Sequence, residues 1–327
     1  MSKHIIYIAL FLTVLVGCQG KGSTKVSATG SIYECLVVCP SGVYSDIEAV
    51  MGADMPCMPQ MEPYFTVSHV SNAAFDDFLK PTRNILLIDI DSVRYTTVKA
   101  KMSKDYWSKP QRLCRIQSPD KGAFIEYWQE HGEQIRDWFV RQEIERQGSF
   151  YRAYTNKEAR KALQNRFKCD MLISEDYQLI KDTTDFVWCC NNKGTMRRDL
   201  VVYSYPYTDA NTFTLDYLCH QRDSVLGRFI TAQVAGSYMG TEYKVFPPQL
   251  RILGKGQTND FYAAEVRGLW KIYNGEAMGG PFVSLTHIDE TNHRIITAEV
   301  FVYAAGQKKR NALRQAEAIL YTWNKDR

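Results

Sequence analysis

The sequence lacks the residue patterns that most often bind metal ions. Its nine cysteines and six histidines include no Cys-x-x-Cys pair and no paired histidine spacing, which argues against a zinc site. It also lacks an excess of one charge: 40 Lys and Arg nearly balance 36 Asp and Glu, and the net charge of +4 is too small to predict nucleic-acid binding. No apolar run is long enough to cross a bilayer comfortably as a permanent helix. We therefore expect no metal, no cofactor and no nucleic acid.

The N-terminus has the order of a secretory signal. A lysine precedes an apolar run over residues 5–16, and the small residue Gly17 stands before Cys18. Leu15-Val16-Gly17-Cys18 resembles the lipobox of bacterial lipoproteins, which implies cleavage before Cys18 and attachment of lipid to its sulfur. We predict a lipoprotein signal peptide over residues 1–17 and a water-soluble body that acyl chains on Cys18 hold to a membrane.

A short polar segment follows the predicted lipidation site. Residues 18–31 are rich in Gly, Ser and Thr without apolar periodicity, so we expect a flexible tether. No Asp or Glu lies in this segment. Acidic tags at this place resemble surface-export signals of some lipoproteins, so their absence favours the periplasmic side. The predicted location is the cell envelope, with the protein lipid-anchored at the outer membrane and facing the periplasm.

The remaining chain has the composition of a globular protein, with 45% hydrophobic and 13% aromatic residues. Its length is about twice the commonest domain size, which predicts one large domain or two intimate ones. The periodicities predict an α+β fold of mostly antiparallel sheets with helices packed on one face. We place one half at residues 32–150 and the other at 151–327. The order of their elements suggests two similar halves, each ending in a helix with a late tryptophan, Trp138 or Trp323.

Three elements have clear local signals. Ser118 is the predicted N-cap of a long helix, with Pro119 at its first position. Residues 281–288 and 293–303 predict a β-hairpin. Residues 308–323 predict a final helix with one apolar stripe.

Eight cysteines remain once Cys18 is assigned to lipid. An exported protein meets oxidants, so an even number invites disulfides. Several of these cysteines lie in apolar segments, however, where a free thiol behaves as a small hydrophobe. Cys35 and Cys39 cannot bond to each other, because residues four apart in a strand are about 13 Å distant. The sequence leaves the question of other disulfides open.

Asp89 and Asp91 follow an apolar strand and resemble the first motif of haloacid-dehalogenase-type phosphatases. Carboxylates at a strand end suit Mg²⁺, which prefers oxygen ligands. In that family a helix follows the motif, whereas here a strand-like segment follows Val93, so we interpret the pair as marking a turn. A metal-dependent hydrolase or phosphotransfer enzyme that uses Asp89 and Asp91 is the alternative function.

A second group has the residue types of metal ligands: His287, Asp289, Glu290 and His293. These residues are not on a predicted helix, and the hairpin places them at its turn. We therefore interpret them as solvated turn residues.

One stretch could form a ligand cleft. Along a strand Glu265 and Arg267 face the same side and can pair. Two successive glycines before a proline predict a tight backbone with positive φ that exposes amide groups near two aromatic rings. The alternative is a plain hairpin with an ion pair and a core tryptophan, which we favour. The candidate cleft residues are Glu265, Arg267, Trp270, Gly279, Gly280 and Phe282.

Several stretches together resemble a domain-of-unknown-function family of Gram-negative envelope lipoproteins. They are the lipobox, Ser108-Lys109-Pro110-Gln111, the run from Glu265 to Trp270, Met278-Gly279-Gly280-Pro281-Phe282 and Lys308-Lys309-Arg310. The resemblance covers nearly the whole mature chain and implies an envelope location, but it supplies no catalytic residues. We expect a non-enzymatic protein that binds a ligand or an unknown envelope protein or glycan.

Overall fold

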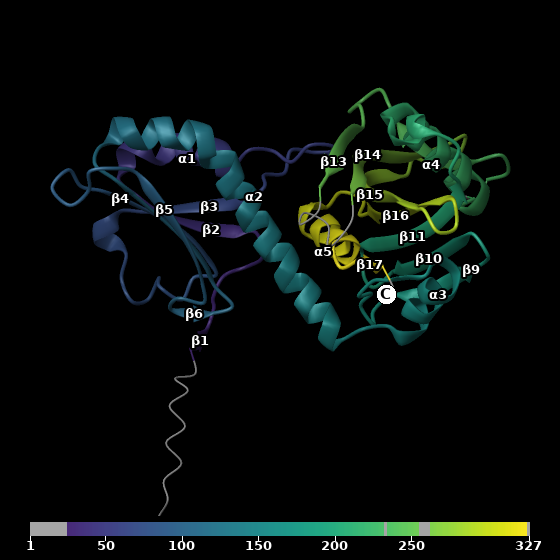
Figure 1. Ribbon diagram of the computed structural model, residues 1–327, viewed down its shortest axis with the longest axis horizontal. Coiled ribbons are helices and arrows are strands. Elements are labelled where there is room, and N and C mark those ends of the chain that lie inside the picture. Colours follow the sequence, from purple (N-terminus) through teal and green to yellow (C-terminus); the bar gives the residue numbers. More distant parts are fainter. Residues whose placement is uncertain (1–24, 232–233, 255–261, 326–327) are drawn as a thin grey trace, which may run out of the picture.

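The structure is a computed structural model that describes residues 25–231, 234–254 and 262–325. The predicted signal peptide and Cys18 lie outside these residues. The described chain forms two lobes, and the long helix α2 (Lys121–Ala153) runs from the first lobe to the second (Figure 1). Among the described helices, none is long and apolar enough to span a membrane.

The first lobe is built on a five-stranded sheet of order β3-β2-β4-β7-β5. Its pairings are parallel except at the edge strand β5. β2 and β4 are mostly buried, as strands covered on both faces must be, which explains their continuous apolar sequences. The strands are β2 (Glu34–Val38), β3 (Thr66–Val70), β4 (Asn84–Ile90), β5 (Lys99–Lys104) and β7 (Arg112–Ser118).

Helix α1 (Tyr44–Met51) and the first half of α2 pack together beside this sheet. The indole of Trp128 in α2 donates a hydrogen bond to the Asp46 carbonyl of α1 at 3.0 Å. The predicted N-cap of α2 is wrong by two residues, because Asp120 caps the helix by accepting from the Ala123 amide at 3.0 Å. The Ser118 hydroxyl instead donates to the Asp120 carbonyl at 2.8 Å, and Asp is as good an N-cap as Ser.

The second lobe is built on an antiparallel sheet of eight strands, with the order β12-β14-β15-β16-β11-β10-β9 and β13 also paired to β14. The predicted hairpin is β15 and β16, paired from Phe282–Phe301 to Asp289–Arg294. The strands are β9 (Gln178–Asp182), β10 (Phe186–Asn191), β11 (Arg197–Pro206), β12 (Tyr238–Glu242), β13 (Gln249–Leu253), β14 (Ala263–Tyr273), β15 (Gly279–Asp289) and β16 (Arg294–Tyr303).

Helices pack against both faces of the second sheet. α4 (Leu215–Phe229) lies in one apolar cluster with Trp270 and Phe282. α5 (Arg310–Leu320) lies in another, which also includes residues of α3 (Lys157–Phe167). The predicted α+β fold of mostly antiparallel sheets is confirmed. The two halves are not similar, however, because one sheet is mainly parallel and the other antiparallel.

α5 joins the lobes. It lies between them next to α2 (Figure 1), and the Glu62 carboxylate of the first lobe accepts hydrogen bonds from the amides of Lys309 and Arg310 at 2.7 and 2.8 Å. A carboxylate at this end of a helix is favoured by the helix dipole. The largest apolar cluster contains buried residues of both lobes.

Part of the predicted tether is attached to the body. β1 (Val26–Ser27) pairs in parallel with β6 (Ser108–Lys109), and Thr29 bridges to Thr82. Residues 25–31 therefore follow the surface of the first lobe, which their Gly- and Ser-rich composition did not predict.

Seven cysteines of the described chain are buried and form no disulfide. Cys35, Cys39, Cys57, Cys114, Cys189, Cys190 and Cys219 are free thiols. Burial raises the pKa of Cys39 to about 11 and that of Cys190 to about 12. These thiols act as small apolar core residues with little thiolate at neutral pH.

Candidate functional site

The structure does not bring the six predicted cleft residues together. Glu265 and Arg267 lie on one face of β14, and Trp270 lies on the other, because an odd spacing along a strand reverses the side. Phe282 is opposite Gly268 and shares the face of Trp270. Trp270 lines a separate cavity of about 250 Å³ with Trp188 and other residues.

Gly279 and Gly280 have a different role from the one predicted. Both lie within strand β15, paired with Lys271 and Trp270 of β14, and neither has positive φ. A Cβ at Gly280 would stand 2.0 Å from the Val302 carbonyl oxygen of the neighbouring strand. These glycines therefore permit close packing of the sheet and do not form a turn with open amides.

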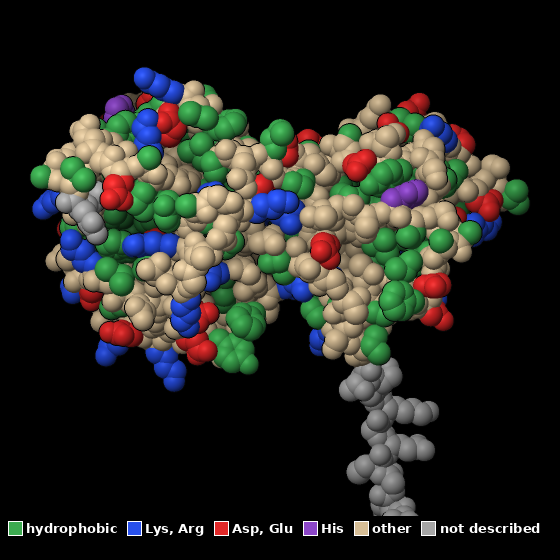
Figure 2. Space-filling model, turned by 180° about the vertical axis from the view of Figure 1, so that it is seen from behind, with side chains coloured by type: hydrophobic (Ala, Val, Ile, Leu, Met, Phe, Trp, Pro, Cys, Tyr) green, Lys and Arg blue, Asp and Glu red, His purple; other side chains and the backbone are tan. Residues whose placement is uncertain are grey.

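A cavity of about 390 Å³ opens between α2, β13, β14 and α5. Arg251 is half exposed at its mouth, whereas Glu265 and Arg314 are almost completely buried. Viewed from behind, the molecule narrows at a furrow between the lobes, and Lys and Arg side chains lie at this furrow (Figure 2). The charged and polar lining includes Asp137, Arg141, Arg251, Glu265, Arg267, Arg314 and Tyr321.

Five charged side chains form an alternating row along this cavity. We call Arg251, Glu265, Arg267, Glu317 and Arg314 the charge row. Arg251 Nη2 is 3.2 Å from Glu265 Oε1, and Arg267 Nε donates to the same oxygen at 3.0 Å. Arg267 Nη2 also donates to Glu317, whose second oxygen accepts from Arg314 Nη1 at 2.9 Å.

The surroundings keep Glu265 and Arg267 ionised. Burial alone would raise the pKa of Glu265, but the guanidinium groups of Arg267 and Arg251 lower it to about 2. Burial alone would lower the pKa of Arg267, yet the carboxylates of Glu265 and Glu317 hold it well above its ordinary value. Burial and then the Glu265 carboxylate raise the pKa of Tyr321 far above its usual range. The Tyr321 hydroxyl donates to Glu265 Oε2 at 2.6 Å.

The charge row contains one more cation than anion. Arg314 is only 4% exposed, and its Nε has no hydrogen-bond partner among the residues that the structure describes. The rings of Tyr33 and Tyr64 lie 5.8 and 5.5 Å from its guanidinium carbon, which offsets part of the desolvation. Buried cations are normally paired with anions, so this end of the cavity has the chemistry to accept an anion.

Sequence reasoning identified two members of the charge row and missed the other three. Of the three missed residues, only Arg314 and Glu317 have a local sequence signal, because a spacing of three residues on a helix allows an ion pair. The apolar stripe of the final helix does not indicate this pair. The contact of Glu317 with Arg267 joins residues 50 positions apart.

Asp89 lies near the end of β4, and Asp91 lies in the capped turn that follows the strand. Asp91 accepts from the amides of Val93 and Arg94, each at 2.9 Å. The Arg94 side chain contacts both carboxylates, and the Tyr95 hydroxyl donates to Asp89 at 2.7 Å. The carboxylate oxygens of Asp89 and Asp91 thus accept hydrogen bonds and form ion pairs with residues of the same segment.

The histidine-containing group does not converge on a metal position. His287 is buried against Trp323, with ring centroids 4.7 Å apart. Asp289 pairs with Arg294 at 2.9 Å. No cluster of three His, Cys, Asp or Glu side chains suited to a metal occurs in the described part of the chain.

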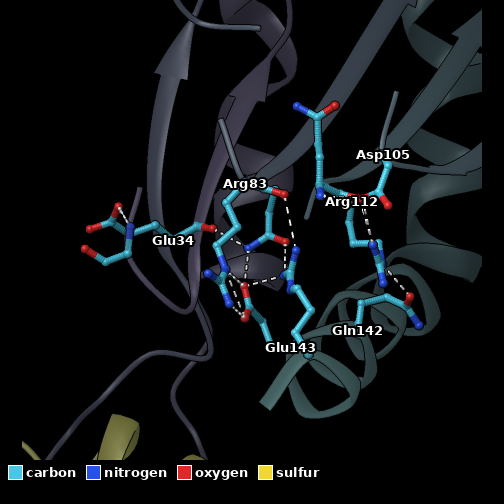
Figure 3. Close-up of polar contacts among 10 residues, drawn as sticks. Glu34, Arg83, Asp105, Arg112, Gln142 and Glu143 are labelled. Atoms are coloured by element: carbon cyan, nitrogen blue, oxygen red, sulfur yellow. Dashed lines mark hydrogen bonds and ion pairs between the residues drawn. The ribbon is translucent and has the colours of Figure 1, made fainter. Parts of the chain in front are cut away.

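A second polar cluster, also missed from the sequence, fastens α2 to the first sheet. The Glu143 carboxylate of α2 accepts hydrogen bonds from Arg83 Nη2 and from the side-chain amide of Asn84, both at 2.7 Å (Figure 3). It also pairs with Arg146 at 2.5 Å. Nearby, Arg112 donates to Gln142 at 2.6 Å. Because the carboxylate oxygens of Glu143 are shared among three donor residues, we interpret this cluster as structural.

Two family models match the chain, one for each lobe. Residues 28–152 match a domain of unknown function (DUF8532). Residues 156–322, more than half of the chain, match another domain of unknown function (DUF4837). The chain belongs to the DUF4837 family. The predicted resemblance to a domain-of-unknown-function family is thereby confirmed.

Solved structures resemble the DUF4837 chain only distantly. The Saccharomyces cerevisiae Ran-binding protein Mog1p is 7% identical with a TM-score of 0.31, over 49% of this chain and 90% of Mog1p. The human StarD13 lipid transfer and protein localization domain is 8% identical with a TM-score of 0.19, over 52% of this chain and 98% of that domain. Scores this low support no inference about function. A comparison with curated proteins finds no match.

Proposed function

We propose that the protein is a lipid-anchored component of the cell envelope, attached through Cys18 to the outer membrane and facing the periplasm. Its body binds a small anion, or an anionic group carried by an envelope glycan or protein, in the cavity between the lobes. In this proposal the protein acts by binding and not by catalysis.

The charge row is the observation that carries the binding proposal. Three arginines and two glutamates leave one positive charge beside a cavity of about 390 Å³, a volume in the range of small-molecule sites. Guanidinium groups suit carboxylates and phosphates, because their planar donors match the spacing of two oxygens. Arg314 lines this cavity, and its Nε is a buried donor without a partner among the described residues.

The leader supports the location. A charged start, an apolar run and Gly17-Cys18 form the signal. Cells that produce the wild type or the Cys18→Ser variant can be labelled with radioactive palmitate. We expect label in the wild type and none in the variant. Equal labelling of the two would overturn the anchor.

The binding proposal is tested on the mature protein in detergent, with inorganic phosphate and citrate as probes and sodium chloride at matched ionic strength as the salt control. A ligand at 100 times its Kd stabilises a protein by about 2.7 kcal/mol, so binding should raise the melting temperature. We compare the wild type with Arg314→Met and with Arg152→Met, which removes an exposed arginine at the end of α2.

We expect phosphate or citrate to raise the melting temperature of the wild type and of Arg152→Met. The Arg314→Met variant should lose most of that increase, because the partnerless donor and the excess charge are both gone. Equal increases in all three proteins, or none beyond the chloride control, would refute an anion site at the charge row.

A further inference from the structure

The described chain begins at one defined place on the first lobe. Val26 is paired with Ser108 in the β1–β6 ladder, and the Lys25 ammonium contacts the Asp105 carbonyl. In Figure 1 these two strands lie at the end of the first lobe opposite helix α1. Whatever precedes Lys25 must depart from this surface.

The connection from Cys18 to this surface is short. Seven residue steps separate Cys18 from Lys25, and a fully extended chain spans about 3.5 Å per residue. The departure point can therefore be at most about 25 Å from an acylated Cys18. If Cys18 is anchored, the side of the first lobe that carries β1 and β6 must stay near the membrane.

Exposed apolar side chains lie around the departure point. Phe78 is 85% exposed, Val26 59% and Tyr106 52%. Single exposed apolar residues are common, but several around one point indicate an interaction surface. Tyr106 is held by a ring contact, because the Trp107 ring lies against both Tyr106 and Phe75, at 4.7 and 5.6 Å between centroids.

The charged residues of this surface fit a membrane as well. Lys109 is exposed and pairs with Ser27, two residues after Lys25. Of the nearby acids, Asp77 pairs with Lys80 at 2.5 Å and Asp105 with Arg112 at 3.5 Å. Asp76 accepts from the amides of Phe78 and Leu79 at 3.0 and 3.2 Å. Aromatic rings accompanied by lysines are typical of residues at the level of lipid headgroups.

We propose that Lys25, Val26, Phe78, Tyr106 and Lys109, together called the exit face, rest on the phospholipid surface of the anchoring membrane. The inference depends on the proposed lipid anchor and adds an orientation to it. Phe78 and Tyr106 enter the headgroup region, and the two lysines face lipid phosphates. The second lobe and the anion cavity are then held in a fixed direction and do not swing on a free tether.

The test uses the full chain in its native membranes. The photoreactive residue p-benzoylphenylalanine replaces Phe78, Tyr106 or, as a matched control, Phe246, an exposed aromatic residue between β12 and β13 of the second lobe. Cells are grown with radioactive phosphate and irradiated, and phospholipid adducts of the purified protein are counted. We expect at least fivefold more adduct at positions 78 and 106 than at position 246.

Palmitate labelling of the same cells separates the two proposals. If the protein carries palmitate but positions 78 and 106 give no more adduct than position 246, the anchor stands and the exit face is refuted. If adducts form at 78 and 106 on a protein without palmitate, membrane contact stands and the acyl anchor falls. If neither adducts nor palmitate are found, both proposals are overturned.

Discussion

Glu317 is the side chain on which the charge row depends most. It is completely buried, and its two oxygens accept from Arg267 and Arg314. The substitution Glu317→Gln keeps the size and one accepting oxygen but removes the charge. The row then holds three cations and one anion, and two buried guanidiniums share a neutral amide whose NH₂ group can only repel them.

Removing one partner of a buried ion pair usually destabilises a protein by about 3–5 kcal/mol. Because the amide oxygen of glutamine still accepts one hydrogen bond, we expect the lower end, about 3 kcal/mol. For a protein of this size that corresponds to a melting temperature lower by roughly 5–10 °C. The measurement is urea unfolding of the mature protein, followed by tryptophan fluorescence.

Two further variants make the result specific. Glu130→Gln removes an exposed glutamate of α2 and should change the stability by less than about 0.5 kcal/mol. The double variant Arg314→Met/Glu317→Gln restores an excess of one cation, so it should recover at least half of the loss. A loss below about 1 kcal/mol in Glu317→Gln, or no recovery in the double variant, would show that the row does not hold its charges as described.

Two other predictions concern acid and packing. The pKa of Glu265 is lowered to about 2 from an ordinary 4.5. Its ionised carboxylate therefore contributes on the order of 3 kcal/mol to the free energy of unfolding, a contribution that is complete above pH 4.5 and is lost as the pH falls toward 2. The stability of Glu265→Gln in urea should depend less on pH in that window, and a pH dependence equal to that of the wild type would contradict the assignment. Gly280→Ala places a methyl group against the Val302 carbonyl and should destabilise the protein by about 3 kcal/mol. Gly227→Ala on α4 would make only ordinary van der Waals contacts, the nearest at 3.7 Å from the Tyr238 ring, and should be neutral or stabilising by up to about 1 kcal/mol. Equal thermal stabilities of the two variants would refute the packing role.

The strand directions in the first sheet are a feature that local sequence patterns do not predict. The sequence indicates that β2 and β4 are strands buried on both faces. A buried strand has the same apolar sequence whether its neighbours are parallel or antiparallel, so the sequence does not predict the strand directions. The structure makes β2, β3, β4 and β7 parallel, because α1 and the intervening loops carry the chain back between strands. The expectation of two similar halves failed for this reason.

By itself, the sequence determined those helices and strands whose pattern of apolar and polar residues lies in one continuous stretch of the chain. The hairpin of β15 and β16, the helix α5 and the shared face of Glu265 and Arg267 follow from periods of 2.0 and 3.6 residues. Only the tertiary structure decided the partners of those side chains. Glu317 meets Arg267 because α5 packs across the sheet, and such a contact depends on how distant elements fit together, which no local period encodes.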